Sequence, residues 1–223
     1  MTFSIAARCS ETGQFGVAIS SSSPAVAARC AHLRSGVGAV CSQNITDPRL
    51  GPRLLDALAA GSESQRALDA LVGTTAAIEY RQLAVVDATG RTATWSGQHC
   101  LGRVATAKAE NVAAAGNLLA DASIPARMVL AFDELAGHPL GDRLVGALTA
   151  AIAAGGEEGP VHSAGLVIVD SVSWPVTDLR VDWSDDPIGE LRSLWRLWRP
   201  QIDAYVTRAL DPAQAPGYGV KGE

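Results

Sequence analysis

The chain has 223 residues, a net charge of −5, 48% hydrophobic residues and 18% charged residues. This composition is typical of a folded globular protein and excludes a disordered chain. The sequence has neither a basic block nor an apolar run of about 18 residues, so we expect no nucleic-acid partner and no membrane span. The first residues lack a basic segment followed by an apolar core, so we expect no signal peptide and a cytoplasmic protein.

Residues 1–23 predict two short strands joined by a tight turn, and the rest of the chain is organised around them. Phe3, Ile5 and Ala7 recur at the two-residue period of a strand. Gly13 supplies the turn, and the return strand ends in the serine run of residues 20–23.

The next segments alternate between strands and helices. Residues 24–34 predict a short helix or a covering loop, and residues 36–43 predict a buried strand. Two helices follow, and we expect Ser62 to cap the second. The clearest hairpin runs from Tyr80 to Trp95, and residues 112–119 predict a further strand.

The second half of the chain repeats this order. Apolar residues at helical spacing predict helices over residues 128–135 and 140–152. Residues 163–170 predict an apolar strand, and residues 178–182 predict its partner. The last helix is expected over residues 188–205.

We predict a single domain over residues 1–210, followed by a C-terminal tail over residues 211–223. Tight turns between strands favour antiparallel sheets, whereas apolar residues at consecutive positions indicate that both faces of a sheet are covered. A four-layer α/β/β/α sandwich of two antiparallel sheets, in the α+β class, satisfies both. A single mixed sheet with helices on one side is the alternative.

Thr2 is a candidate nucleophile because it directly follows Met1. If Met1 is removed, the α-amine of Thr2, with a pKa of roughly 7.7–8.0, can act as a base toward its own hydroxyl. The alternative is that Thr2 is simply the second residue of the chain.

The four cysteines, Cys9, Cys30, Cys41 and Cys100, form no Cys-x-x-Cys pair and have no histidine at zinc-ligand spacing. We therefore expect buried thiols, no metal and no cofactor.

Characteristic motifs lie at residues 2–5, 12–13, 16–18, 36–40, 42–43, 51–53, 81–87, 116–117 and 178–182. Together they resemble a bacterial and archaeal family of unknown function that is grouped with the N-terminal-nucleophile (Ntn) hydrolases. The resemblance covers roughly residues 2–198. It implies the same four-layer sandwich and the hydrolysis of amide-type C–N bonds.

The chain departs from this family at residues 157–163. Similar proteins usually carry a basic segment ending in Gln-Ser here, whereas this chain has Glu157, Glu158 and, in place of the glutamine, His162. His162 is therefore a candidate base, because a histidine titrates near neutral pH. A solvated loop histidine is the alternative.

Acyl transfer also requires hydrogen-bond donors and a substrate site. As catalytic residues we predict Thr2, Gln43, Asn117 and His162, although amides at strand ends also cap the backbone. Arg180 and Asp182 alternatively form a buried pair that sets the strand register. The predicted substrate-binding residues are Ser20, Ser22, Ser23, Asn44, Arg180 and Asp182.

Three functions remain open. The first is a metal-independent hydrolase that acts, through Thr2, on an amide, imide or enamine C–N bond of a small metabolite. The second is the same reaction with His162 as the base. The third is a non-catalytic small-molecule binding or assembly module, in which Trp195 and Trp198 anchor a homo-oligomer interface unless they only pack in the core.

Overall fold

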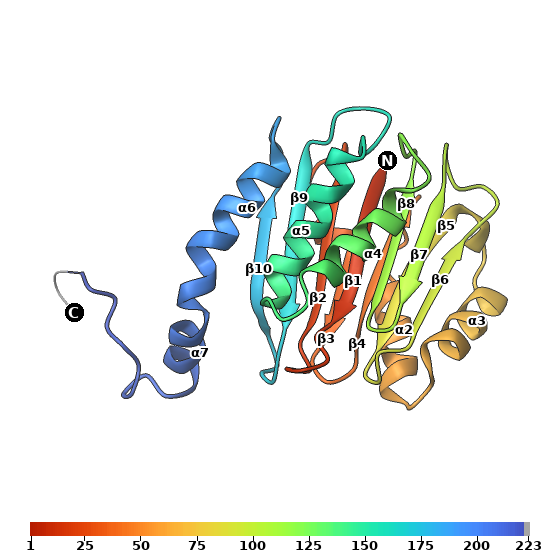
Figure 1. Cartoon of the computed structure of the whole chain (residues 1–223). Coiled ribbons are helices and arrows are strands. Elements are labelled where there is room, and N and C mark those ends of the chain that lie inside the picture. The colour runs from red at the N-terminus through yellow and green to blue at the C-terminus, as the bar shows by residue number, and fades with distance from the viewer. Residues whose placement is uncertain (221–223) are drawn as a thin grey trace.

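The structure is a computed structural model that describes residues 1–220. Two antiparallel sheets pack face to face, and helices cover the outer face of each (Figure 1). The four-layer α/β/β/α sandwich predicted from the sequence is therefore confirmed, and the single mixed sheet is excluded.

The larger sheet has six strands in the order β10-β9-β2-β1-β8-β7, so the first strand of the chain lies in its middle. Every neighbouring pair is antiparallel. Its strands are β1 (Thr2–Arg8), β2 (Phe15–Ser21), β7 (Ala105–Ala109), β8 (Val112–Asn117), β9 (Ser163–Val169) and β10 (Pro175–Val181).

The smaller sheet has four strands in the order β3-β4-β5-β6. It stacks on the larger sheet with β4 over β1 and β5 over β8. Its edge strand β3 contacts β2 and β9, so β10 extends beyond it. Its strands are β3 (Ala31–Arg34), β4 (Gly38–Asn44), β5 (Arg81–Asp87) and β6 (Thr92–Ser96).

Helices form the two outer layers. The larger sheet is covered by α4, α5 and α6, and the smaller sheet by α2 and α3. The helices are α1 (Ala27–Cys30), α2 (Leu50–Ala59), α3 (Ser64–Thr74), η1 (Ile78–Tyr80), α4 (Ile124–Glu134), α5 (Leu140–Ala153), α6 (Pro187–Trp198), η2 (Arg199–Gln201) and α7 (Ile202–Leu210). In residues 1–220, every helix is too short or too polar to cross a lipid bilayer.

The layer between the sheets is made largely of small side chains. Ala6, Ala39, Ala84 and Ala113 are fully buried there, together with Cys41. Small residues let two sheets approach closely, which brings polar groups on opposite sheets within hydrogen-bonding distance of each other.

Two strands were not predicted. Residues 24–34 form the short helix α1 followed directly by the edge strand β3, rather than a helix or loop alone. Strand β7 alternates half-buried alanines with Thr106 and Lys108. Alanine is a weak strand signal, so the pattern was hidden in the sequence.

Two helix expectations were wrong. Helix α3 begins at Ser64 rather than after Ser62, because the carboxylate of Asp87 at the end of β5 accepts the Ser64 N–H over 3.0 Å. The last helix is divided into α6, η2 and α7 at Pro200, whose ring and missing N–H interrupt a helix.

Both tryptophans of the last helical region face the domain. Trp195 is 4% exposed and donates to Asp142 over 2.8 Å, whereas Trp198 donates to the Val176 carbonyl over 3.0 Å. They fasten α6 to α5 and β10, so the homo-oligomer stays a prediction without support from these side chains. The predicted tail follows α7, and residues 221–223 lie outside the described residues.

Candidate active site

Strand ends from both sheets meet at the N-terminal end of β1. Thr2 pairs with Asn117 at the end of β8, and its side chain faces the smaller sheet, as those of Ser4 and Ala6 do. Gln43 at the end of β4 and Gln82 at the start of β5 lie opposite each other on that sheet. Polar side chains therefore replace the small apolar ones at this end of the central layer.

These side chains form a continuous network of hydrogen bonds. Ser4 Oγ donates to Gln43 Oε1 over 2.5 Å, and Gln43 Nε2 donates to Gln82 Oε1 over 2.8 Å. Asn117 Nδ2 donates to the same Gln82 oxygen over 3.1 Å, while Gln82 Nε2 donates to the Gly116 carbonyl over 2.9 Å. All three amide side chains are completely buried. The network therefore ties β1, β4, β5 and β8 together beneath Thr2.

The hydroxyl of Thr2 lies in a cluster of serines. Thr2 Oγ1 is 3.3 Å from Ser21 Oγ, and both hydroxyls donate to the Met1 carbonyl. Ser21 Oγ is also 2.9 Å from Ser23 Oγ. Thr2 is only 5% exposed, so the hydroxyl is closed off from solvent in the chain that carries Met1.

Residues 155–162, between α5 and β9, pass over this end of the sheet near the N-terminus (Figure 1). Glu157 forms an isolated bridge with Leu119 beyond the end of β8, and its Oε2 accepts the Ser22 N–H over 3.3 Å. A Cβ placed on Gly159 would lie 3.5 Å from the Met1 Cε. This segment therefore covers the start of β1.

Glu157 is a buried carboxyl group, 4% exposed. Burial raises the pKa of Glu157 to about 7, although the Met1 ammonium and the hydrogen bond from Ser22 act in the opposite direction. Its Oε1 atom has no hydrogen-bond partner. A carboxyl group that titrates near neutral pH beside a candidate nucleophile is typical of a functional site.

The predicted serines divide between the two faces of the sheet. Ser23 belongs to the Thr2 cluster and also accepts from Arg29 over 2.6 Å. Ser22 contributes its backbone N–H to Glu157. Ser20 faces the helix side, where its hydroxyl donates to the Ser163 carbonyl over 2.9 Å, so Ser21 takes the place expected for Ser20.

Asn44 and His162 point away from the Thr2 cluster. Asn44 takes a left-handed conformation with φ 74°, accepts from Leu101 N and donates to the Tyr80 carbonyl, so it orders a loop. The His162 ring stacks on Trp183 at 4.3 Å, with Nδ1 3.1 Å from the Ser184 carbonyl. The structure therefore brings Gln43 and Asn117 to Thr2 but leaves the His162 ring on the loop before α6.

Arg180 lies on β10 and Asp182 follows its end, and β10 is separated from β1 by β9 and β2. At about 4.8 Å per strand, that is roughly 14 Å from Thr2. Arg180 forms an ion pair with Asp178 over 3.6 Å, and both side chains are nearly half exposed, so the alternative of a buried register-setting pair is wrong. Asp182 is exposed, and its carbonyl accepts the Ala25 N–H over 3.0 Å.

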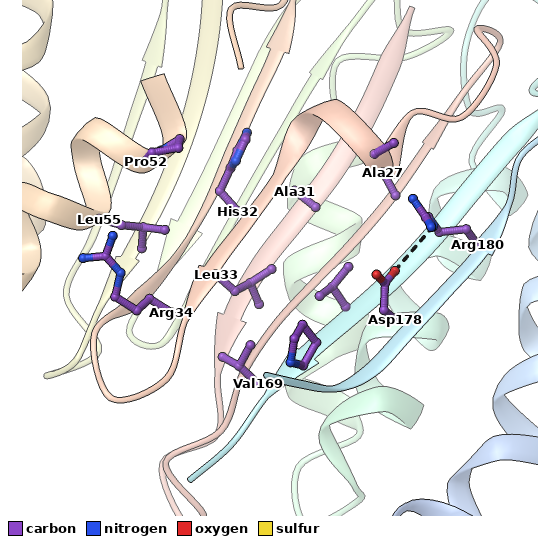
Figure 2. Close-up of a pocket in the computed structure, with 13 residues that line it drawn as sticks. Ala27, Ala31, His32, Leu33, Arg34, Pro52, Leu55, Val169, Asp178 and Arg180 are labelled. Atoms are coloured by element: carbon purple, nitrogen blue, oxygen red, sulfur yellow. Dashed lines mark ion pairs between the residues drawn. The ribbon is translucent and has the colours of Figure 1, made fainter. Parts of the chain in front are cut away.

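Arg180 instead lines a groove of about 400 Å³ at the open side of the sandwich. Figure 2 shows Arg180 and Asp178 on one wall of this groove and His32, Leu33 and Arg34 of β3 on the other. The groove exists because β10 extends past β3. Its lining shares no residue with the Thr2 cluster.

The sequence of residues 2–191 matches the family model of DUF1028, a family of unknown function. The chain belongs to the DUF1028 family. The chain is similar to a DUF1028 protein from Silicibacter pomeroyi whose crystal structure is known. The two sequences are 30% identical, the match covers 88% of each chain, and the TM-score is 0.81. No curated protein sequence is similar enough to count as a match.

Two further solved structures are similar at lower levels. Anbu, an ancestral beta-subunit from Yersinia bercovieri, is 12% identical over 98% of this DUF1028 chain and all of its own, with a TM-score of 0.39. A Gly-1 mutant of Anbu from Hyphomicrobium sp. strain MC1 is 11% identical over 92% and 99% of the two chains, with the same TM-score of 0.39.

Three residues of this DUF1028 site were not among the predicted site residues: Ser21, Gln82 and Glu157. Gln82 had a signal, because it is a polar residue at the start of an apolar strand, as Gln43 is at the end of one. Ser21 was one position from a predicted residue, and only the alternation of side chains along β2 decides between them. Glu157 lies in a loop, where no periodicity indicates burial.

Among residues 1–220, no group of three or more His, Cys, Asp or Glu side chains has a geometry suited to a metal ion. The groups that the site offers for chemistry are hydroxyls, amides, one buried carboxyl group and the N-terminal amine. Together they suit nucleophilic attack and proton transfer.

Proposed function

We propose that this DUF1028 protein is a hydrolase of an amide-type C–N bond in a small metabolite, with Thr2 as its nucleophile after the removal of Met1. The observation that carries the proposal is the convergence of Thr2 Oγ1 with Ser21 Oγ, 3.3 Å apart, above the buried amide network. Amides and imides are the substrate classes that we propose, because both have an acyl carbon for Thr2 to attack.

Removal of Met1 changes the site in two ways. It creates an α-amine on the residue that carries the nucleophilic hydroxyl, and it takes away the carbonyl oxygen to which Thr2 and Ser21 now donate. The position of that oxygen suits a substrate carbonyl oxygen, because a hydroxyl donor already points to it. Met1 therefore occupies the proposed substrate position.

In the proposed reaction, the free α-amine accepts the proton of Thr2 Oγ1 as Oγ1 forms a bond with the substrate carbonyl carbon. Ser21 Oγ donates to the developing oxyanion. The C–N bond breaks as the ammonium returns its proton to the leaving nitrogen. Water then hydrolyses the ester on Thr2, with the amine again acting as the base.

Gln43 and Asn117 have a positioning role in this proposal. Each donates to Gln82 Oε1, over 2.8 and 3.1 Å, so these N–H groups are already used inside the network. Their contribution is to hold β1 in place, because a misplacement of about 1 Å costs roughly a hundredfold in rate.

The test has two parts. Mass spectrometry of the purified native protein gives the fraction of chains that begin at Thr2. A screen of small amides and imides then compares wild type with Thr2→Ala, Thr2→Ser and the control Thr12→Ala, whose site is an exposed turn. We expect loss of turnover in Thr2→Ala only. Full retention of Met1 in active protein, or an active Thr2→Ala, overturns the proposal.

The groove favours a second candidate function, a binding module for a small anionic metabolite. Its walls carry Arg34 and Arg180, which pair with Asp56 and Asp178, together with the half-buried ring of His32 (Figure 2). Thermal-shift assays with small dicarboxylates test this, with Arg180→Gln as the variant and Arg66→Gln on exposed α3 as the control. A shift that survives Arg180→Gln contradicts binding in the groove.

A further inference from the structure

Glu157 is located directly over the start of β1. Strand β1 lies between β2 and β8 in the sheet. Glu157 touches the residues that follow both neighbours, Ser22 after β2 and Leu119 after β8. The side chain of Met1 lies beside Gly159 in the same segment. The Glu157 carboxyl group is also within electrostatic range of the α-ammonium group of Met1, one residue before Thr2.

One oxygen of this carboxyl group is unused. Oε2 accepts the Ser22 N–H, whereas the buried Oε1 has no partner. In the part of the chain that the structure describes, no Lys, Arg or His side chain forms an ion pair with Glu157. A buried carboxylate without a cation is costly, so the site favours a nearby positive charge.

We propose that Glu157 is the carboxylate partner of the Thr2 α-ammonium group in the chain that has lost Met1. This inference rests on the proposed function, in which Thr2 becomes the first residue. Glu157 acts as a positioning residue: it orients the amine beside Thr2 Oγ1 and determines the pH at which the amine becomes a free base.

The direction of the pH effect follows from the charges. An anion close to an ammonium group stabilises its protonated form and raises its pKa by about 1–3 pH units. The free amine, and with it the base for Thr2 Oγ1, therefore appears at a higher pH in wild type than in a variant without the carboxylate. In the chain that carries Met1, burial raises the pKa of Glu157 to about 7 even though the Met1 ammonium is nearby.

The other charged groups near Glu157 are unchanged between wild type and a variant at position 157. Glu158 is half exposed and 3.9 Å from Arg103, whose guanidinium also donates to the Leu119 carbonyl. Arg29 reaches the cluster through Ser23. His162 lies five residues on, paired with Asp185 at 3.5 Å. The thiol of Cys30 is also within electrostatic range of the N-terminus.

The experiment measures the α-amine itself, without a substrate. The full chain is produced with Thr2 as its first residue, by cleavage of an N-terminal fusion at the Met1–Thr2 boundary. A limiting amount of acetic anhydride labels the amine between pH 5 and pH 10, and mass spectrometry gives the labelled fraction and its midpoint. Wild type is compared with Glu157→Gln, Glu157→Asp and the control Glu158→Gln.

We expect the midpoint to fall by about 1 pH unit in Glu157→Gln, to fall less in Glu157→Asp, and to stay within about 0.3 pH units in Glu158→Gln. Equal midpoints in wild type and Glu157→Gln overturn the inference, as does an equal fall in Glu158→Gln. Thermal melts of each variant confirm folding.

This result and the proposed function fail separately. If the midpoint falls in Glu157→Gln but the Thr2-first wild type has no turnover, the hydrolase is contradicted and the ion pair is retained. Turnover by the Thr2-first chain without a midpoint shift contradicts the role of Glu157 alone. If Glu157→Asp restores the midpoint, the carboxylate rather than the shape of the side chain is responsible.

Discussion

Gln43 of β4 and Asn117 of β8 belong to different sheets, yet both donate to the same oxygen, Oε1 of Gln82, over 2.8 and 3.1 Å. Gln82 is therefore the hub that joins the two sheets beneath Thr2. Since its own Nε2 donates to the Gly116 carbonyl, both ends of the amide are used.

Gln82→Ala should destabilise the fold strongly. The substitution leaves the amides of Gln43 and Asn117 buried without their acceptor, and an unsatisfied buried group costs about 1–3 kcal/mol. We expect a loss of roughly 3 kcal/mol in urea unfolding. Gln98→Ala, at an exposed position, is the control and should change stability by less than about 0.5 kcal/mol. Equal effects of the two substitutions would contradict the role of the network.

The chain that carries Met1 should lose stability with rising pH because of Glu157. Its pKa is raised in the fold to about 7, so the protonated form is favoured there. The contribution of the protonated Glu157 to the free energy of unfolding is complete below the pKa of the unfolded state, near 4.5. It is lost as the pH rises through about 7, the pKa in the fold. At about 1.4 kcal/mol per pH unit, the loss is roughly 3 kcal/mol.

Urea unfolding at pH 5 and pH 8 checks this for the Met1-bearing chain. The unfolding free energy of Glu157→Gln minus that of wild type should be more positive at pH 8 than at pH 5. Glu158→Gln alters a carboxylate that is half exposed and should leave the difference between the two pH values unchanged. If the difference in unfolding free energy between wild type and Glu157→Gln is the same at pH 5 and pH 8, Glu157 is not a buried, poorly paired carboxyl group.

Two glycines in helices should respond in opposite directions to alanine. In Gly141→Ala on α5, the new Cβ would lie 2.3 Å from the Trp195 ring, so we expect a loss of about 1–3 kcal/mol. In Gly73→Ala on α3, the Cβ meets no atom within 4 Å, so we expect a gain of about 0.5 kcal/mol. Thermal melts of both variants test these two expectations. If Gly141→Ala leaves the stability unchanged, the Trp195 ring moves aside without a cost in free energy.

The cysteines should differ in reactivity. Cys41 is completely buried, and burial raises the pKa of its thiol to about 12. Burial also acts on Cys9, but hydrogen bonds from Thr12 and the backbone of Glu11 lower its pKa overall. In native protein at pH 8, iodoacetamide should therefore alkylate Cys9 well before Cys41, because the thiolate is the reactive form.

Mass spectrometry of tryptic peptides gives the order of alkylation. Protein unfolded in urea is the control, in which Cys9 and Cys41 should react at similar rates. Fast alkylation of Cys41 in the native protein would show that the layer between the sheets opens readily.

Much of the architecture follows from local sequence signals. The alternation in residues 1–23 and the hairpin from Tyr80 to Trp95 are visible because each pattern depends on neighbouring residues. Short turns then required antiparallel sheets, and apolar strands required cover on both faces, which together determine the four layers. The positions of Thr2, Gln43 and Asn117 at strand ends were likewise readable from the sequence.

Only the tertiary structure decided which of these strand ends meet and which side chains share a face. Ser21 rather than Ser20 reaches Thr2 because the register of β1 and β2 determines the face, and Arg180 lies three strands away because β9 and β2 come between. The burial of Glu157 depends on a loop that crosses the ends of strands distant in sequence. Such contacts are set by packing between elements, and no local pattern in the chain encodes them.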